Sequence, residues 1–159
     1  GDGAGVFKST DRGNNWTQIN NGLDSLETNI LTVDPNDSET LYLGTDDDGV
    51  YKSTDGGESW KKLTVSSLSK SFGVGDIIVD PQNSNNIYIG TVDYFRLSES
   101  RGVLGDFGVY KSTDGGATWE EFNVGLNHLG VFSLELSEEN RILYAGTRAG
   151  GVYWISLDN

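Results

Sequence analysis

The chain has 159 residues, of which 24 are acidic and 11 basic. The resulting net charge of −13 excludes a nucleic-acid surface, because phosphate binding needs clustered Lys and Arg. Cysteine is absent, which excludes disulfides and thiolate metal sites, and no apolar run approaches the roughly 18 residues of a membrane-inserted helix.

A repeated segment follows the chain from its first residues. It reads GVFKSTDRGNNW, GVYKSTDGGESW and GVYKSTDGGATW at residues 5–16, 49–60 and 108–119, and GVYWISLDN begins a fourth copy at residue 151. Upstream segments repeat as well, as LTVDPNDSETLYLGT, IIVDPQNSNNIYIGT and SLELSEENRILYAGT at 31–45, 77–91 and 133–147. One structural unit is therefore used several times.

Each unit predicts four strands, here called A to D. An apolar run such as residues 77–79 is strand A, and it ends at an Asp-Pro turn because proline cannot continue a central strand. LYLGT is strand B and GVYKS is strand C. Strand D begins at the tryptophan and continues, for example, through residues 61–65. The 22 glycines suit such short strands joined by tight turns.

The pattern predicts an all-β chain that forms one segment of a β-propeller over residues 1–159. Four-stranded units of about 45 residues have the size of a propeller blade. The expected parts are strands C and D of a first partial blade in 1–22, a second blade in 27–65, a third blade in 72–123 with an insertion at 93–107, and strands A, B and C of a last partial blade in 129–159.

The repeated Ser-x-Asp-x-Gly-x-x-Trp pattern resembles the Asp-box, or BNR repeat, of Asp-box β-propellers. Three full copies in register with their flanking strands identify this superfamily across essentially the whole chain. The pattern occurs at Ser9, Asp11, Gly13 and Trp16, at Ser53, Asp55, Gly57 and Trp60, and at Ser112, Asp114, Gly116 and Trp119. The superfamily includes sialidases, xyloglucan-cleaving glycosidases, the sortilin-type receptor domain and a photosystem II assembly factor, and the fold does not choose among them.

We interpret the boxes as turn-forming elements rather than catalytic groups. Glycine tolerates a positive φ at the turn, Asp and Ser accept or donate local hydrogen bonds, and Trp covers the turn with an apolar ring. Acid–base chemistry would need pairs of Asp that converge on one substrate. We expect the boxes instead to lie far apart, at the same corner of different blades.

A little over three blades cannot form an ordinary closed ring, because closed propellers have four to eight blades. We therefore expect either a part of a longer propeller or copies that associate into a ring or fibre, with a strand exchanged between them. The chain contains no methionine, so we also expect it to be processed or trimmed.

The insertion suggests a binding surface for a glycan or a protein. Insertions in repeats usually lie in loops of the working face, and this one carries aromatic and Arg side chains suited to an interface. The candidate binding residues are Tyr94, Phe95, Arg96 and Arg101, together with Arg148 in the corresponding loop of the last blade.

Neither a cofactor nor a metal site is expected. Asp46, Asp47 and Asp48 are adjacent, so their side chains alternate in direction and do not match a calcium loop. His128 is the single histidine and has no matched nucleophile.

These observations favour a non-catalytic, extracellular module that binds a partner or assembles with itself. The alternative is a fragment of a glycoside hydrolase, which would need two facing carboxylates or, in a sialidase, converging arginines and a tyrosine. The candidate carboxylates on the loop face are Asp46, Asp47, Asp48, Asp76, Asp93, Glu99 and Asp106.

Overall fold

The computed structural model describes residues 3–68, 72–93, 107–148 and 150–158, and within these ranges it contains only β-strands and turns. The all-β prediction is therefore confirmed, and this part of the chain holds no helix that could cross a membrane. The strands are β1 (Phe7–Lys8), β2 (Thr17–Gln18), β3 (Thr28–Asp34), β4 (Asp37–Thr45), β5 (Val50–Ser53), β6 (Lys61–Lys62), β7 (Gly73–Val79), β8 (Ile87–Val92), β9 (Val109–Ser112), β10 (Glu120–Glu121), β11 (Val131–Ser137), β12 (Ile142–Thr147) and β13 (Gly151–Ser156).

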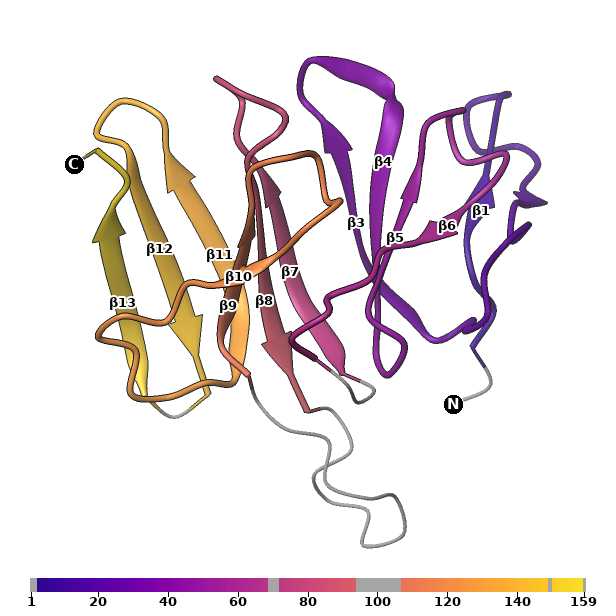
Figure 1. Cartoon of the computed structure of the whole chain (residues 1–159). Helices are drawn as coiled ribbons and strands as arrows, with labels where there is room; N and C mark the ends of the chain where they lie inside the picture. The colour runs from indigo at the N-terminus through magenta and orange to yellow at the C-terminus, as the bar shows by residue number, and fades with distance from the viewer. Residues whose placement is uncertain (1–2, 69–71, 94–106, 149, 159) are drawn as a thin grey trace, which may run out of the picture.

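The strands form four antiparallel sheets that stand side by side in a row (Figure 1). β1 and β2 make the first partial blade, β3 to β6 the second blade, β7 to β10 the third blade, and β11 to β13 the last blade. Within each sheet the strands pair in chain order. The first and last sheets lie at opposite ends, so the described sheets form an open row and not a closed ring, as predicted.

Strand D is shorter than the sequence predicts. It covers only Lys61–Lys62 in the second blade and Glu120–Glu121 in the third, and all four side chains are exposed. Val65, which was expected to continue strand D, is instead buried in the core beyond the strand. A short, charged outer strand protects the edge of each blade from pairing with other chains.

The core lies between neighbouring sheets rather than inside any one of them. Tyr42 and Val50 of the second blade share one buried cluster with Ile77 and Ile89 of the third. A second cluster joins residues of the third and last blades, among them Tyr88, Val109, Val131 and Leu143. Burying such a side chain contributes about 1.5–3 kcal/mol, so each sheet depends on the next for its stability.

Glycine permits the close approach of successive sheets at strand A. A Cβ atom at Gly75 would lie 2.2 Å from the carbonyl oxygen of Val131 in β11. A Cβ atom at Gly44 would lie 2.8 Å from Cβ of Val74 in β7. Neither position has room for a side chain, because such contacts are far shorter than van der Waals distances.

One buried ion pair also ties the third blade to the last. Arg141 donates to both carboxylate oxygens of Asp80, at 2.9 and 2.6 Å, and the Asp80 side chain is fully buried. Burial acts to raise the pKa of Asp80, but the hydrogen bonds from Arg141, Gln82 and Asn86 outweigh it and lower the pKa overall. Asp80 therefore stays ionised inside the interface.

Each Asp-box is a turn held by its own Ser and Asp. In the third blade, Ser112 Oγ donates to Asp114 Oδ1 at 2.8 Å and accepts the amide of Gly116 at 2.9 Å. Asp114 also accepts the amide and hydroxyl of Thr118, at 2.8 and 2.6 Å. Gly116 has a φ of 93°, a conformation that side chains other than glycine rarely adopt.

Neighbouring Asp-boxes are linked through a lysine of strand C, although the sequence suggested that they lie far apart. Lys8 Nζ donates to the carbonyl oxygen of Gly56 in the next blade at 3.0 Å. Lys52 Nζ donates in the same way to Gly115 at 3.1 Å. The repeat therefore carries a blade-to-blade contact in its Gly-Val-aromatic-Lys segment.

The box tryptophan packs against the preceding blade. Trp60 and Trp119 are 5% and 7% exposed, and Trp60 donates its indole N–H to the carbonyl oxygen of Ile19 in the first partial blade at 2.8 Å. Trp16 belongs to the first sheet of the row and is 62% exposed. The same motif thus has a different burial at the end of the row.

The fourth repeat keeps the register of the earlier copies but has another residue at the position of the box serine. β4 pairs Leu41 with Ser53, and the equivalent pair in the last blade is Leu143 with Ile155. Ile155 therefore occupies the position of the box serine, and Ser156 lies one residue too late to form the turn network. By the same register, Trp154 occupies the position of the linking lysine Lys52.

Removing the hydroxyl of a buried box serine and of an exposed one tests whether burial determines how much the turn contributes to the free energy of unfolding. We expect Ser112→Ala to lower the free energy of unfolding by about 1–3 kcal/mol, because the Gly116 amide is left buried without its acceptor. Ser9→Ala removes the same bonds from an exposed turn and should cost less than ~1 kcal/mol. Urea unfolding measures both, and equal losses would contradict the explanation.

The boxes also predict how stability depends on acid. Side-chain hydrogen bonds from Ser59 and Thr118 are the main causes that lower the pKa values of Asp55 and Asp114 to about 2, from the ordinary 3.8. A folded-state pKa below the unfolded value gives stability that is present above about pH 4 and lost as the pH falls toward 2. The pKa values of Asp46 and Asp76 are raised above 3.8, so their effect on stability is the opposite. Their contribution is lost as the pH rises through those pKa values.

Urea unfolding at about pH 4 and at about pH 2.5 measures this loss. The double substitution Asp55→Asn and Asp114→Asn should flatten the change in stability between the two values, because Asn does not titrate. An unchanged slope in the double variant would show that other groups cause the acid sensitivity.

Candidate binding face

The loops between strands fall on two faces of the row. In the second and third blades, the Asp-box lies beside the turn between strands A and B of its own blade, since Gly56 donates its amide to the carbonyl oxygen of Glu39 and Gly115 to that of Asn85, at 2.9 and 3.0 Å. The loops between strands B and C, and those leading from strand D into the next strand A, form the opposite face, called here the loop face. The predicted binding residues belong to the loop face.

Most of the predicted binding residues lie outside the described part of the chain. These are Tyr94, Phe95, Arg96 and Arg101, together with the carboxylates Glu99 and Asp106. The residues that flank them are described: Asp93 is 3% exposed, and Phe107 donates its amide to the hydroxyl of Thr91 at 3.0 Å.

Arg148 is described, and it bridges the third and last blades on the loop face. Its guanidinium donates to the carbonyl oxygen of Asp93 at 3.0 Å and lies over the ring of Phe132, 5.0 Å from the centroid. Its own amide donates to Gly130 at 2.8 Å. Phe132 remains 39% exposed, so a cation and an aromatic face lie together at the point where the insertion begins.

The three adjacent aspartates after β4 have three different environments. Asp47 accepts the hydroxyl of Ser25 at 2.9 Å, and Asp48 accepts Lys62 Nζ at 2.5 Å and the hydroxyl of Tyr51. Asp46 is half-buried, and this burial, followed by the nearby Glu27 carboxylate, raises its pKa. Within the described ranges, no group of three ligating side chains could hold a metal ion.

The remaining candidate carboxylates serve the scaffold. Asp76 accepts the amides of Ile77 and Leu134, both at 2.8 Å, and so connects the third blade to the last. Burial raises its pKa more than these two amides lower it. Asp93 is 3% exposed, and its backbone carbonyl oxygen accepts a hydrogen bond from Arg148 at 3.0 Å. Asp46 is therefore the candidate that combines a raised pKa with a position in a surface loop.

His128 has a packing role in the loop that leads into β11. A Cβ atom at Gly150 would lie 2.3 Å from the His128 ring, so the imidazole rests against the backbone of the loop between β12 and β13. No described group gives it the geometry of a catalytic base.

Sequence reasoning missed two features of the site. Asp46, Asp47 and Asp48 have different environments because each has a different neighbour. These neighbours come from other strands and loops and are, in the same order, Glu27, Ser25 and Lys62. The stacking of Arg148 on Phe132 joins two segments that carry no common motif. No local pattern in the sequence signals either contact.

Comparison with known proteins gives the same architecture. A xyloglucanase, Xgh74A of Acetivibrio thermocellus, is 36% identical over 96 residues, which cover 55% of this chain and 11% of that protein. The crystal structure of an ancestral GH74 enzyme matches 97% of this chain with a TM-score of 0.76 and 25% identity. The GH74 enzyme of Niastella koreensis matches 95% with a TM-score of 0.69 and 28% identity.

The chain spans about a tenth of the length of the xyloglucanase, and it covers 20% and 24% of the two solved enzymes. The matched structures are thus several times longer than the row of sheets described above.

A family model, that of Sortilin-Vps10 (sortilin, neurotensin receptor 3), matches residues 4–153, which is nearly the whole chain. Together with the repeated Asp-box and the open row of four-stranded sheets, this match establishes that the chain belongs to the Sortilin-Vps10 family of Asp-box propellers.

Proposed function

We propose that the chain is a scaffold segment of a larger β-propeller of the xyloglucanase type, to which it contributes part of a glycan-binding face. The similarity to two GH74 enzymes over 95% or more of the chain is the observation that carries this proposal. The relative named as a xyloglucanase points to a β-glucan as the ligand class. A polysaccharide ligand of this size fits the extracellular location inferred from the sequence.

The segment is proposed to bind glycan without cleaving it. Glycoside hydrolysis requires two carboxylates placed across the scissile bond, roughly 5–10 Å apart. Of the described loop-face carboxylates, Asp46 and Asp76 have raised pKa values, and Asp76 is engaged with backbone amides. Asp47 and Asp48 are engaged with Ser25 and Lys62, so Asp46 suits a general acid best. A partner carboxylate from further blades would complete a catalytic pair.

Self-association is a second candidate function, favoured by the apolar side chains at both ends of the row. Leu31 and Val33 are each 48% exposed near the first sheet, and Val152 and Trp154 are 71% and 67% exposed on the last. Light scattering coupled to size exclusion, over a hundredfold range of protein concentration, tests this role. A discrete multimer would support it, and a monomer throughout would exclude it.

Glycan binding is tested by affinity gel electrophoresis and calorimetry with xyloglucan oligosaccharides. We expect saturable binding without release of reducing ends. Arg148→Met should weaken binding about tenfold, ~1.4 kcal/mol, because a charged donor beside Phe132 is lost. Arg12→Met is the matched control, since Arg12 lies in an Asp-box turn on the opposite face and should leave binding unchanged.

Two results would contradict the proposal. A folded wild-type chain that fails to bind xyloglucan oligosaccharides at millimolar concentration would remove the glycan-binding role. Release of reducing ends by the chain alone would contradict the absence of cleavage, and Asp46→Asn would then show whether Asp46 takes part.

A further inference from the structure

A polar groove lies between the second and third blades, on the face that carries the Asp-boxes. Its volume is about 570 Å³, within the roughly 300–1,000 Å³ of small-molecule sites. The turns beside it, between β5 and β6 and between β9 and β10, lie at the same end of the row (Figure 1). Its lining includes Lys52, Lys61, Thr54, Ser59 and Asp114.

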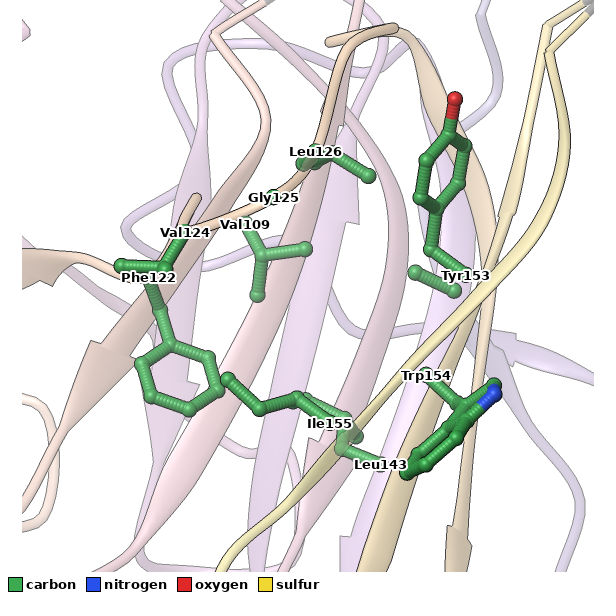
Figure 2. Close-up of a pocket in the computed structure, with 10 residues that line it drawn as sticks. Val109, Phe122, Val124, Gly125, Leu126, Leu143, Tyr153, Trp154 and Ile155 are labelled. Carbon is green, nitrogen blue, oxygen red and sulfur yellow. The ribbon is translucent and has the colours of Figure 1, made fainter.

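The groove differs in chemistry from the pocket between the third and last blades. Figure 2 shows Val109, Phe122 and Leu143 in that pocket, and its described lining carries no charged side chain. The groove instead combines two lysines, a carboxylate and two hydroxyl groups, with Trp60 and Leu63 as its apolar part. A ligand of the groove is therefore expected to be polar and charged.

The corresponding gap between the first and second blades contains two glutamates. Lys8, the equivalent of Lys52, donates to the carbonyl oxygen of Gly56 at 3.0 Å and to Glu58 Oε1 at 3.3 Å. Glu39 lies beside the same turn, because a Cβ atom at Gly56 would be 2.7 Å from Glu39 Oε2 and 3.4 Å from Lys8 Nζ. In this copy, carboxylates of the protein itself lie near the lysine.

Both glutamates have neutral equivalents in the second gap. The second and third Asp-boxes align residue by residue, so Ala117 takes the place of Glu58. Asn85 takes the place of Glu39, since the backbone carbonyl oxygen of each accepts the amide of a box glycine. The second gap therefore has two fewer negative charges than the first.

The second gap also has one more lysine. Lys61 pairs with Lys52 in the sheet, whereas Thr17 pairs with Lys8 in the first partial blade. Lys61 is exposed and lines the groove together with Lys52. The two gaps thus have the same backbone contact between blades but opposite local charge.

The ammonium group of Lys52 is held in place and still has free donors. It donates to the carbonyl oxygen of Gly115 at 3.1 Å and lies 5.2 Å from the centre of the Tyr42 ring. Of the described residues, only Gly115 accepts a hydrogen bond from it, and none forms an ion pair with it. Asp114 instead accepts the amide and hydroxyl of Thr118. Since an ammonium group has three N–H donors, Lys52 can still donate to a ligand.

We propose that this groove binds a carboxylate-bearing sugar of the uronic acid class. The carboxylate of the sugar takes the place on Lys52 that Glu58 takes on Lys8, with Lys61 as the second cation. The two hydroxyl side chains of the groove bond to hydroxyl groups of the ring, and the volume of the groove favours a sugar over a small inorganic anion. The site lies on the Asp-box face, so it does not rest on the glycan contact proposed at Arg148.

The expected affinity is in the millimolar range. Ion pairs at exposed positions contribute little on their own, and the side chains of the Lys8–Glu58 pair are 38% and 67% exposed. Two lysines that act together with the hydroxyl groups are therefore needed to retain the ligand.

NMR titration of the ¹⁵N-labelled chain with sodium glucuronate, at constant ionic strength, tests the proposal. We expect saturable shifts of the Gly115 and Gly116 amides, which line the groove. Glucose is the matched neutral sugar, and it should bind about tenfold more weakly or not at all, because it lacks the carboxylate.

Ala117→Glu supplies the groove with the carboxylate that the first gap already has. We expect it to pair with Lys52 and to weaken glucuronate binding about tenfold or more. Asn14→Glu is the matched control, because it adds the same charge at the same position of the first Asp-box, away from the groove. It should keep the wild-type affinity, and urea unfolding should show that both variants fold.

The loop face gives an independent readout. Arg148→Met, which tests the proposed glycan contact there, should leave glucuronate binding unchanged. Ala117→Glu should likewise leave the binding of xyloglucan oligosaccharides unchanged. The failure of one proposal is therefore distinguishable from the failure of the other.

Three results would overturn the proposal. Absence of saturable shifts in the folded wild-type chain would remove the site. Undiminished binding by Ala117→Glu would place the ligand on another surface. Acetate that binds as tightly as glucuronate would assign the groove to simple carboxylates instead of sugar acids.

Discussion

Each sheet in this chain buries its faces by packing against the sheets on either side, and the rest of the structure depends on that contact. Ile77 and Val79 of strand A in the third blade are at most 5% exposed because the second blade covers them. Leu31 and Val33 of strand A in the second blade are each 48% exposed, although their sequence environment is the same. The apolar surface that a strand buries, and with it the strand's contribution to stability, therefore depends on the neighbouring blade, as in other repeat architectures.

The Asp-box combines a local turn with contacts to adjacent blades. Its Ser and Asp satisfy the turn amides within the blade, whereas its Trp and the preceding Lys contact adjacent blades. Trp16 shows the separation of the two roles, because its turn keeps the hydrogen bonds of Ser9 while its ring is 62% exposed. The carboxylates of the boxes are thus used for folding.

Features encoded within one repeat could be predicted from the sequence, and features that depend on a neighbouring blade could not. The all-β class, the order of strands and the open row follow from short local patterns, and the structure agrees. The replacement of the box serine by Ile155 also follows from the local pattern, since GVYWI aligns with GVYKS, and strand pairing agrees with it. The raised pKa of Asp46 was missed, since burial and Glu27 produce it.

The candidate carboxylates of the loop face differ in what surrounds them. Burial raises the pKa values of both Asp46 and Asp76, but Asp76 accepts the amides of Ile77 and Leu134 and so connects two blades. Asp76 therefore contributes to the blade interface, whereas Asp46 lies in the loop between β4 and β5, so the two carboxylates with raised pKa values serve different parts of the structure.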